Sequence, residues 1–133
     1  MIENLTPNKE LSIKQFIPGI AWFFFFFLLI CMPGKNVPKV DWLDIMDIDK
    51  LIHCGIFGMM VVLFCYPFKK TTDTRSQKIN WFIKIALSTC IWGLATEFIQ
   101  KYFIPGRFFD IIDWVADSLG VLLAYFFCKK FFV

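Results

Sequence analysis

Four ionisable side chains interrupt apolar stretches of the sequence, where charge is unusual: His53, Glu97, Asp113 and Asp117. An imidazole flanked by carboxylates can act as a general acid or base, with one carboxylate orienting its second nitrogen. A charged aspartate at the centre of a membrane helix costs about 2.5–3.5 kcal/mol on the insertion scale, so such residues indicate a functional site by default. We therefore take His53, Glu97 and Asp113 as candidate catalytic residues.

Helical spacing predicts that these side chains converge. Asp110, Asp113 and Asp117 are three and four residues apart, so they share one face of a helix. Glu97 and Gln100 are three residues apart and share a face of the preceding helix. Because only a short connection joins the two stretches, they form an antiparallel hairpin. We expect the two polar faces to lie at similar depth.

Polar residues at the helix ends extend the candidate site toward a ligand. The candidate ligand-binding residues are Asp49, Lys50, Gln100, Arg107, Asp110 and Asp117. Lys50 and Arg107 supply positive charge, and the N-terminal ends of the second and fourth apolar helices offer N–H groups to an anion. Asp49 and Asp110 also suit simple helix caps, since the helix dipole favours acids there. For the four intramembrane residues, the structural alternative is a network that only holds helices together.

The same carboxylates raise the question of a metal ion. One histidine excludes a three-histidine zinc centre within one chain. The five cysteines form no C-x-x-C pair and suit small, apolar-facing positions. A hard cation held by Glu97 and the three aspartates is conceivable, but Lys50 and Arg107 can balance the same charge. We expect no metal, and the sequence names no cofactor.

The elements that must position these residues are membrane-spanning helices. Hydrophobic residues make up 58% of the 133 residues and aromatics 20%, more than one soluble core of this size can hide. Four apolar stretches run over about 16–32, 51–67, 79–100 and 110–128, each near the length of a bilayer crossing. Segments in lipid must satisfy their own backbone groups, so they are helical. We predict an all-α, four-helix membrane bundle forming a single domain, 1–133.

The placement of Lys and Arg predicts the orientation. With Lys84 left aside, eight lie in the N-terminal lead, the second connection and the C-terminus, against five in the other two connections. Both termini are then cytoplasmic and the candidate site faces outward. The first outward connection carries Asp41, Asp44 and Asp47 beside Trp42, which is typical of a short amphipathic segment on the membrane surface.

These residues resemble the VanZ-like family of bacterial membrane proteins. The motifs that carry the resemblance are Asp49-Lys50-x-x-His53, Glu97-x-x-Gln100, Pro105-x-Arg107, and Asp113 followed by Ala116-Asp117-x-x-Gly120. The resemblance covers about residues 33–124, and the family pattern commonly has Asn where this chain has Asp117. It implies the cytoplasmic membrane of a bacterium and a cell-envelope role. The member that names the family is linked to teicoplanin-type resistance, but the resemblance supplies no reaction.

Together these features predict a polar pocket, open to the extracytoplasmic side, that binds or modifies an envelope lipid or wall-precursor head group. Whether it is an enzyme stays open, as does the oligomeric state. The alternative is a non-catalytic membrane partner that organises envelope enzymes. A transporter subunit is a weaker reading, because the polar residues gather at one end of the bundle. The net charge of +3 is spread along the chain, so no nucleic-acid partner is expected.

Overall fold

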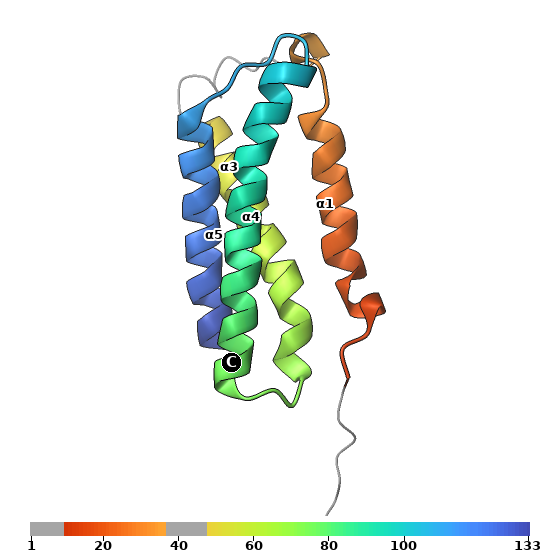
Figure 1. The fold of residues 1–133 in the computed structure, drawn as a ribbon, viewed down its shortest axis with the longest axis vertical. Coiled ribbons are helices and arrows are strands. Elements are labelled where there is room, and N and C mark those ends of the chain that lie inside the picture. The colour runs from red at the N-terminus through yellow and green to blue at the C-terminus, as the bar shows by residue number, and fades with distance from the viewer. Residues whose placement is uncertain (1–9, 37–47) are drawn as a thin grey trace, which may run out of the picture.

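The computed structural model describes residues 10–36 and 48–133, and within these ranges every regular element is helical (Figure 1). The long helices are α1 (Ile17–Ile30), α3 (Ile48–Cys65), α4 (Arg75–Phe103) and α5 (Ile111–Phe131). Short 3-10 turns are η1 (Ile13–Phe16), η2 (Gly34–Asn36) and η3 (Tyr66–Lys70). With its flanking turns counted, each helix is long and apolar enough to cross a membrane. The predicted all-α fold with four spans is therefore confirmed for these residues.

The predicted amphipathic segment around Asp41, Trp42, Asp44 and Asp47 lies outside the described residues. The remaining connections place the elements clearly (Figure 1). The connection from α4 to α5 lies at one end of the bundle, beside the end of α1. The connection from α3 to α4 lies at the other end, near the C-terminus and the start of η1.

The helices extend beyond the apolar stretches because polar residues cap them. α4 begins at Arg75 rather than near 79, since Thr74 and Gln77 form a reciprocal capping box. The backbone N–H of Gln77 donates to Thr74 Oγ1 at 3.3 Å, and that of Thr74 donates to Gln77 Oε1 at 2.8 Å. α5 begins after Asp110, whose Oδ1 accepts the N–H of Ile112 at 2.8 Å. Asp110 is thus the N-cap of α5.

The closest helix pair is α3 and α5, which cross where both carry small residues. A Cβ atom added at Gly120 of α5 would collide with the backbone carbonyl of Cys54. A Cβ atom at Gly58 would lie 3.1 Å from the carbonyl oxygen of Gly120. The two backbones therefore approach each other more closely than larger side chains would allow.

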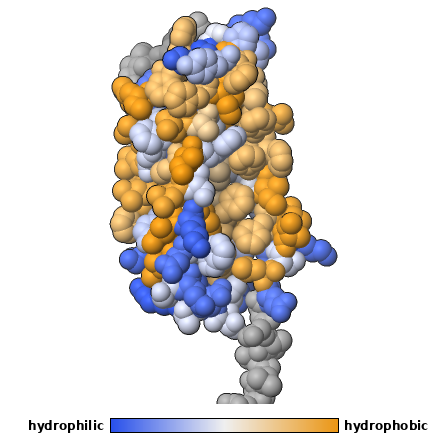
Figure 2. Space-filling view, in the orientation of Figure 1, coloured by the Kyte–Doolittle hydropathy of each residue, from blue (hydrophilic) through white to orange (hydrophobic). Residues whose placement is uncertain are grey.

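A buried apolar cluster fills the space between α3, α4 and α5. Its members are Phe57, Val61, Cys65, Phe68, Phe82, Val121, Ala124, Cys128 and Phe132. Outside this core, large apolar side chains point outward, with Leu28 and Ile91 each 70% exposed. In the face shown in Figure 2, apolar residues dominate the middle and hydrophilic residues gather mainly toward the ends. This surface suits a hydrocarbon solvent rather than water.

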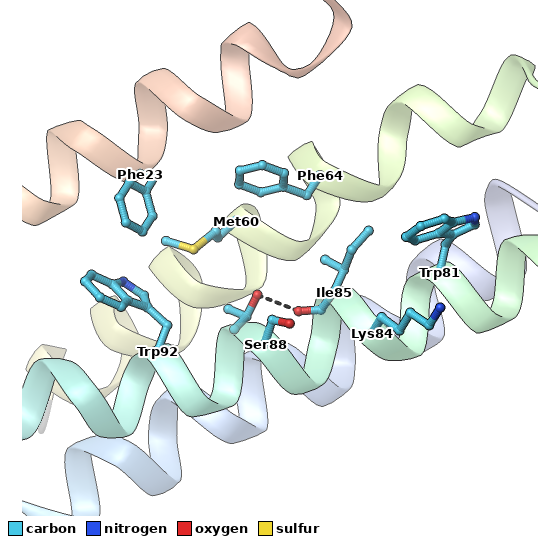
Figure 3. Close-up of a pocket in the computed structure, with 9 residues that line it drawn as sticks. Phe23, Met60, Phe64, Trp81, Lys84, Ile85, Ser88 and Trp92 are labelled. Atoms are coloured by element: carbon cyan, nitrogen blue, oxygen red, sulfur yellow. Dashed lines mark hydrogen bonds between the residues drawn. The ribbon is translucent and has the colours of Figure 1, made fainter. Parts of the chain in front are cut away.

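Helix α1 packs less tightly and leaves a groove beside α3 and α4. Its Trp22 Nε1 donates to the carbonyl oxygen of Ile56 at 3.1 Å, and its Phe23 ring lies 5.0 Å from that of Trp92. Between these helices is a cavity of about 320 Å³, into which Phe23, Met60 and Trp92 point (Figure 3). Lys84 lies toward its far end, with its Nζ 4.7 Å from the Trp81 ring centroid.

Candidate functional site

His53 and Asp117 are the centre of the candidate site. His53 lies near the start of α3 and Asp117 lies two turns into α5, and the close crossing at Gly120 brings them together. His53 Nδ1 and Asp117 Oδ1 are 2.9 Å apart. Asp117 is completely buried, whereas the side chain of His53 is 28% exposed. This hydrogen bond fixes the imidazole on the side that faces the bundle interior.

Asp113 faces the other nitrogen of the same ring. Its Oδ2 lies 3.9 Å from His53 Nε2, and its side chain is 19% exposed. That separation is too long for a hydrogen bond but short enough for a substantial electrostatic interaction in a partly buried site. The imidazole therefore lies between two aspartates that are one helical turn apart on α5.

Glu97 approaches from α4 and serves the start of α5. It is 1% exposed, and its Oε2 accepts the backbone N–H of Asp110 at 2.9 Å. An N-terminal N–H of a helix has no partner within that helix, so the carboxylate supplies one. The spacing of Glu97 in the sequence did not predict this bond, which ties the last turns of α4 to the N-cap residue of α5.

Several oxygens of the cluster are buried without a hydrogen-bond partner. Among the described residues these atoms are Glu97 Oε1, Asp113 Oδ1, Asp117 Oδ2 and Ser118 Oγ. Gly93 leaves the space that Asp117 occupies, since a Cβ atom there would lie 3.2 Å from Asp117 Oδ2. One donor atom each from His53, Glu97 and Asp117 lies within 4.8 Å of the others. This donor set has the composition of a metal site.

A cavity of about 110 Å³ lies beside His53, between α1, α3 and α4, and its lining does not include the three carboxylates. Its polar lining comes from His53, Thr96, Gln100 and Arg107. Arg107 is oriented by its Nε, which donates to the carbonyl oxygen of Met32 at 3.5 Å. His53 thus connects two environments, the carboxylate cluster and a cavity that carries a guanidinium group.

Comparison with known proteins agrees with the motifs. The sequence model of the VanZ/LLP1 family matches residues 3–133. The chain belongs to the VanZ/LLP1 family. It is 32% identical to an uncharacterized protein of Schizosaccharomyces pombe over 76 residues, which cover 57% of this chain and 43% of that protein. The chain thus matches less than half the length of that relative, and no solved structure matches it.

This VanZ/LLP1 protein is a multi-pass membrane protein, and its predicted site residues fall into separate groups. His53, Glu97 and Asp117 converge, with Asp113 beside the imidazole. Gln100 and Arg107 share the cavity with His53. The remaining predicted residues, Asp49, Lys50 and Asp110, make local contacts at the starts of α3 and α5.

The three residues at the rim of the VanZ/LLP1 site make local contacts. Asp49 lies in the first turn of α3 with its side chain 57% exposed, and its Oδ2 lies 3.5 Å from Lys50 Nζ. Asp110 uses its carboxylate to cap α5. Its backbone N–H, rather than its side chain, is what contacts Glu97. The capping alternative therefore holds for Asp110.

The sequence did not predict the contribution of α1 or the hydrogen bond of Thr96. Phe26, Leu29 and Ile30 of α1 line the cavity beside Arg107, yet an apolar helix without polar residues gives no signal of this. Thr96 is buried and donates from Oγ1 to the carbonyl oxygen of Gly93 at 2.7 Å. Its position next to Glu97 was the only available sign.

Proposed function

We propose that this VanZ/LLP1 protein binds the phosphate-bearing head group of an anionic lipid in the cavity between His53, Gln100 and Arg107, and holds or modifies it there. The observation that carries the proposal is the position of His53, with Asp117 on one nitrogen and the Arg107 cavity on its open side. The cavity opens at the end of the bundle that we assign to the extracytoplasmic side, with both termini cytoplasmic.

The lining of the cavity suits a phosphate. A guanidinium presents several N–H donors in a planar fork that matches phosphate oxygens. Gln100 adds an amide, and it is buried at the same wall. A phosphate placed there would replace water around Arg107 with phosphate oxygens, which accept hydrogen bonds from the guanidinium N–H groups. The apolar side chains of α1 at this wall would contact the less polar part of the same ligand.

The groove under α1 supports a lipid rather than a free phosphate. Phe26 borders the head-group cavity, and Phe23, about one turn earlier in α1, borders the apolar groove of about 320 Å³ (Figure 3). An acyl chain lying along α1 would bury apolar surface in this groove. The two cavities are thus arranged in the order in which a lipid presents its head group and its chain.

The chemistry available to a bound head group is proton transfer at the imidazole. A carboxylate that holds Nδ1 fixes the ring orientation and the tautomer, which leaves Nε2 to give or take a proton. Ser118 is the nearest hydroxyl on α5, and its Oγ is buried without a partner. We propose His53 as the acid or base, Asp117 as the group that orients it and Asp113 as a nearby negative charge, and leave the reaction unnamed.

A relative in Schizosaccharomyces pombe favours a membrane lipid over a cell-wall precursor, since yeasts make no peptidoglycan. In a bacterial host, the same pocket would accept the diphosphate of a lipid-carried wall precursor. A link to glycopeptide resistance would then act through such a precursor. A membrane lipid and a lipid-carried wall precursor share the phosphate group that this cavity would bind.

The proposal is tested by measuring the affinity of the purified protein, in detergent, for short-chain phosphatidylglycerol. Native mass spectrometry gives the fraction of protein with lipid bound. Arg107→Gln should weaken binding about tenfold or more, because a charge-assisted hydrogen bond contributes about 1.5–3 kcal/mol. Lys101→Gln is the matched control, since Lys101 is an exposed cation at the same end, 5.0 Å from the Tyr102 ring centroid. A diacylglycerol of the same chain length should bind equally to both variants. If Arg107→Gln and Lys101→Gln weakened phospholipid binding equally, the proposal would be overturned.

A second candidate function is a non-catalytic membrane partner of envelope enzymes. The hydrogen bond from Asp110 N–H to Glu97 favours it, because this contact holds the α4–α5 hairpin together without any ligand. On that reading the carboxylates are structural, and removing them lowers stability first. Function would then fall only as fast as the amount of folded protein.

A further inference from the structure

The side chains of His53, Glu97 and Asp117 together have the features of a metal centre. Head-group binding does not explain why Glu97 Oε1 and Asp117 Oδ2 are buried without hydrogen-bond partners. We propose that His53, Glu97 and Asp117 bind a divalent first-row transition-metal ion, with Mn²⁺ and Zn²⁺ the best matched. From the sequence alone, no metal is expected at these carboxylates. That expectation assumed that nearby cations would balance their charge.

The positions of the donor atoms support the proposal. Metal bonds of about 2.0–2.2 Å place two ligands at a right angle about 3.0 Å apart and tetrahedral ligands about 3.4 Å apart. His53 Nδ1 and Asp117 Oδ1 are separated by 2.9 Å. The third donor, from Glu97, completes a group whose members all lie within 4.8 Å of one another. Side-chain shifts of about 1 Å bring all three to bonding distance.

The buried oxygens that lack partners point to a missing cation. Glu97 is 1% exposed and Asp117 is fully buried, yet Glu97 Oε1 and Asp117 Oδ2 have no hydrogen-bond partner. An ionised carboxylate in such a place is strongly destabilising unless it is paired or coordinates a metal. Arg107 does not fill this role, because it lines the cavity that excludes these carboxylates and directs its Nε to the carbonyl oxygen of Met32.

Asp113 has the position of a supporting carboxylate. A histidine that ligates a metal through one nitrogen commonly donates its other N–H to a carboxylate, which fixes the ring and strengthens the ligand. Here Nδ1 faces Asp117, and Asp113 Oδ2 lies 3.9 Å from Nε2. His53 therefore has one nitrogen placed to bind a metal ion and the other placed next to a supporting carboxylate.

The donor set selects the class of metal. Ca²⁺ and Mg²⁺ prefer oxygen ligands alone, and Mg²⁺ usually keeps several of its waters. An imidazole suits Zn²⁺, while carboxylates suit Mn²⁺, so one nitrogen with two carboxylates favours either of these over the lighter ions. Two carboxylates also balance the charge of a divalent ion within the membrane interior.

This inference goes beyond head-group binding and assigns His53 a different role. With a metal bound through Nδ1, the imidazole is a neutral ligand whose Nε2–H faces Asp113, so it does not act as an acid or base. The phosphate site at Arg107 is common to both assignments. Arg107→Gln should therefore leave metal affinity unchanged, which separates a failure of one proposal from a failure of the other.

The test is metal binding by the full-length protein, purified in detergent and first treated with a chelator. MnCl₂ and ZnCl₂ should each bind at about one ion per chain by calorimetry, and MgCl₂ at the same concentration should bind much more weakly. Asp117→Asn and Glu97→Gln keep the side-chain shape and should each raise the Kd at least about tenfold, a loss seen even for residues that only support a ligand. Asp73→Asn, at the other end of the bundle, is the control and should bind like the wild-type protein.

A spectroscopic measurement on the unaltered protein covers the case in which a variant fails to fold. Electron spin echo spectroscopy of the Mn²⁺ complex should show coupling to a nitrogen nucleus, which can come from His53 as the single histidine. Absence of one-to-one binding by the folded protein would overturn the inference. So would a bound Mn²⁺ without nitrogen coupling, or affinities that the two cluster variants leave unchanged.

Discussion

At the scale of single residues, the two carboxylates nearest His53 differ from Glu97 in what they stabilise. Asp113 and Asp117 act on the imidazole. Glu97 divides its oxygens between the N–H of Asp110 and the interior of the cluster. One oxygen is therefore structural, whereas the other is available to a ligand. Substitutions that separate these duties distinguish a scaffold from a binding site.

We expect Glu97→Gln to retain most of the stability and Glu97→Ala to lose about 1–3 kcal/mol, because only alanine leaves the partly buried N–H of Asp110 without its Glu97 partner. Thermal unfolding of the purified protein in detergent measures the difference. Glu10→Ala removes an exposed carboxylate and is the control. Equal losses for glutamine and alanine would show that the charge, rather than the hydrogen bond, supports the hairpin.

At the scale of elements, the site depends on how closely α5 approaches α3. His53 and Asp117 meet because Gly120 lets α5 contact the backbone of α3 at Cys54. Gly93 does the same for α4, where the missing side chain leaves space for the carboxylate of Asp117. Small residues one turn from the ionisable ones thus decide which polar groups touch.

We expect Gly120→Ala to destabilise the protein by about 1–3 kcal/mol, since overpacking a close contact forces the backbones apart. It should also weaken whichever ligand the His53–Asp117 pair supports. Gly55→Ala is the matched control on α3, because no atom lies within 4 Å of a Cβ atom there. Denaturant or thermal unfolding of both variants measures the effect, and similar stabilities would contradict a tight α3–α5 crossing.

At the scale of the whole molecule, polarity is distributed unevenly between the two ends. The end with the α4–α5 connection holds the candidate site. The opposite end carries Lys69 and Lys70 in η3, and Lys129 and Lys130 in the last turn of α5. The positive-inside rule leads us to propose that this second end is cytoplasmic.

Cysteine labelling in intact cells tests that orientation. A membrane-impermeant thiol reagent should label Phe108→Cys, in the α4–α5 connection where Phe108 is 84% exposed. It should not label Ser76→Cys, at the exposed start of α4. Labelling is read as the increase over wild type, which has five free cysteines of its own. Permeabilised cells provide the control, and the reverse pattern in intact cells would place the site in the cytoplasm.

The sequence by itself determined the class of the protein and the end at which its ionisable residues gather. Composition and four apolar stretches required a membrane bundle, because hydrophobic stretches of this length are stable in lipid only as helices. The three- and four-residue spacing of the aspartates placed them on one face of α5. The motifs also predicted the family, and the match over residues 3–133 confirmed it.

Only the tertiary structure decided which of these residues touch. Periodicity gives the face of a helix but not its rotation or crossing point, so it could not predict that Glu97 binds a backbone N–H or that Asp117 holds His53. It also could not reveal that α1, which has no charged residue, lines the Arg107 cavity. These contacts depend on how closely the helix backbones approach each other. That distance is set jointly by glycines on separate helices, such as Gly58 of α3 and Gly120 of α5.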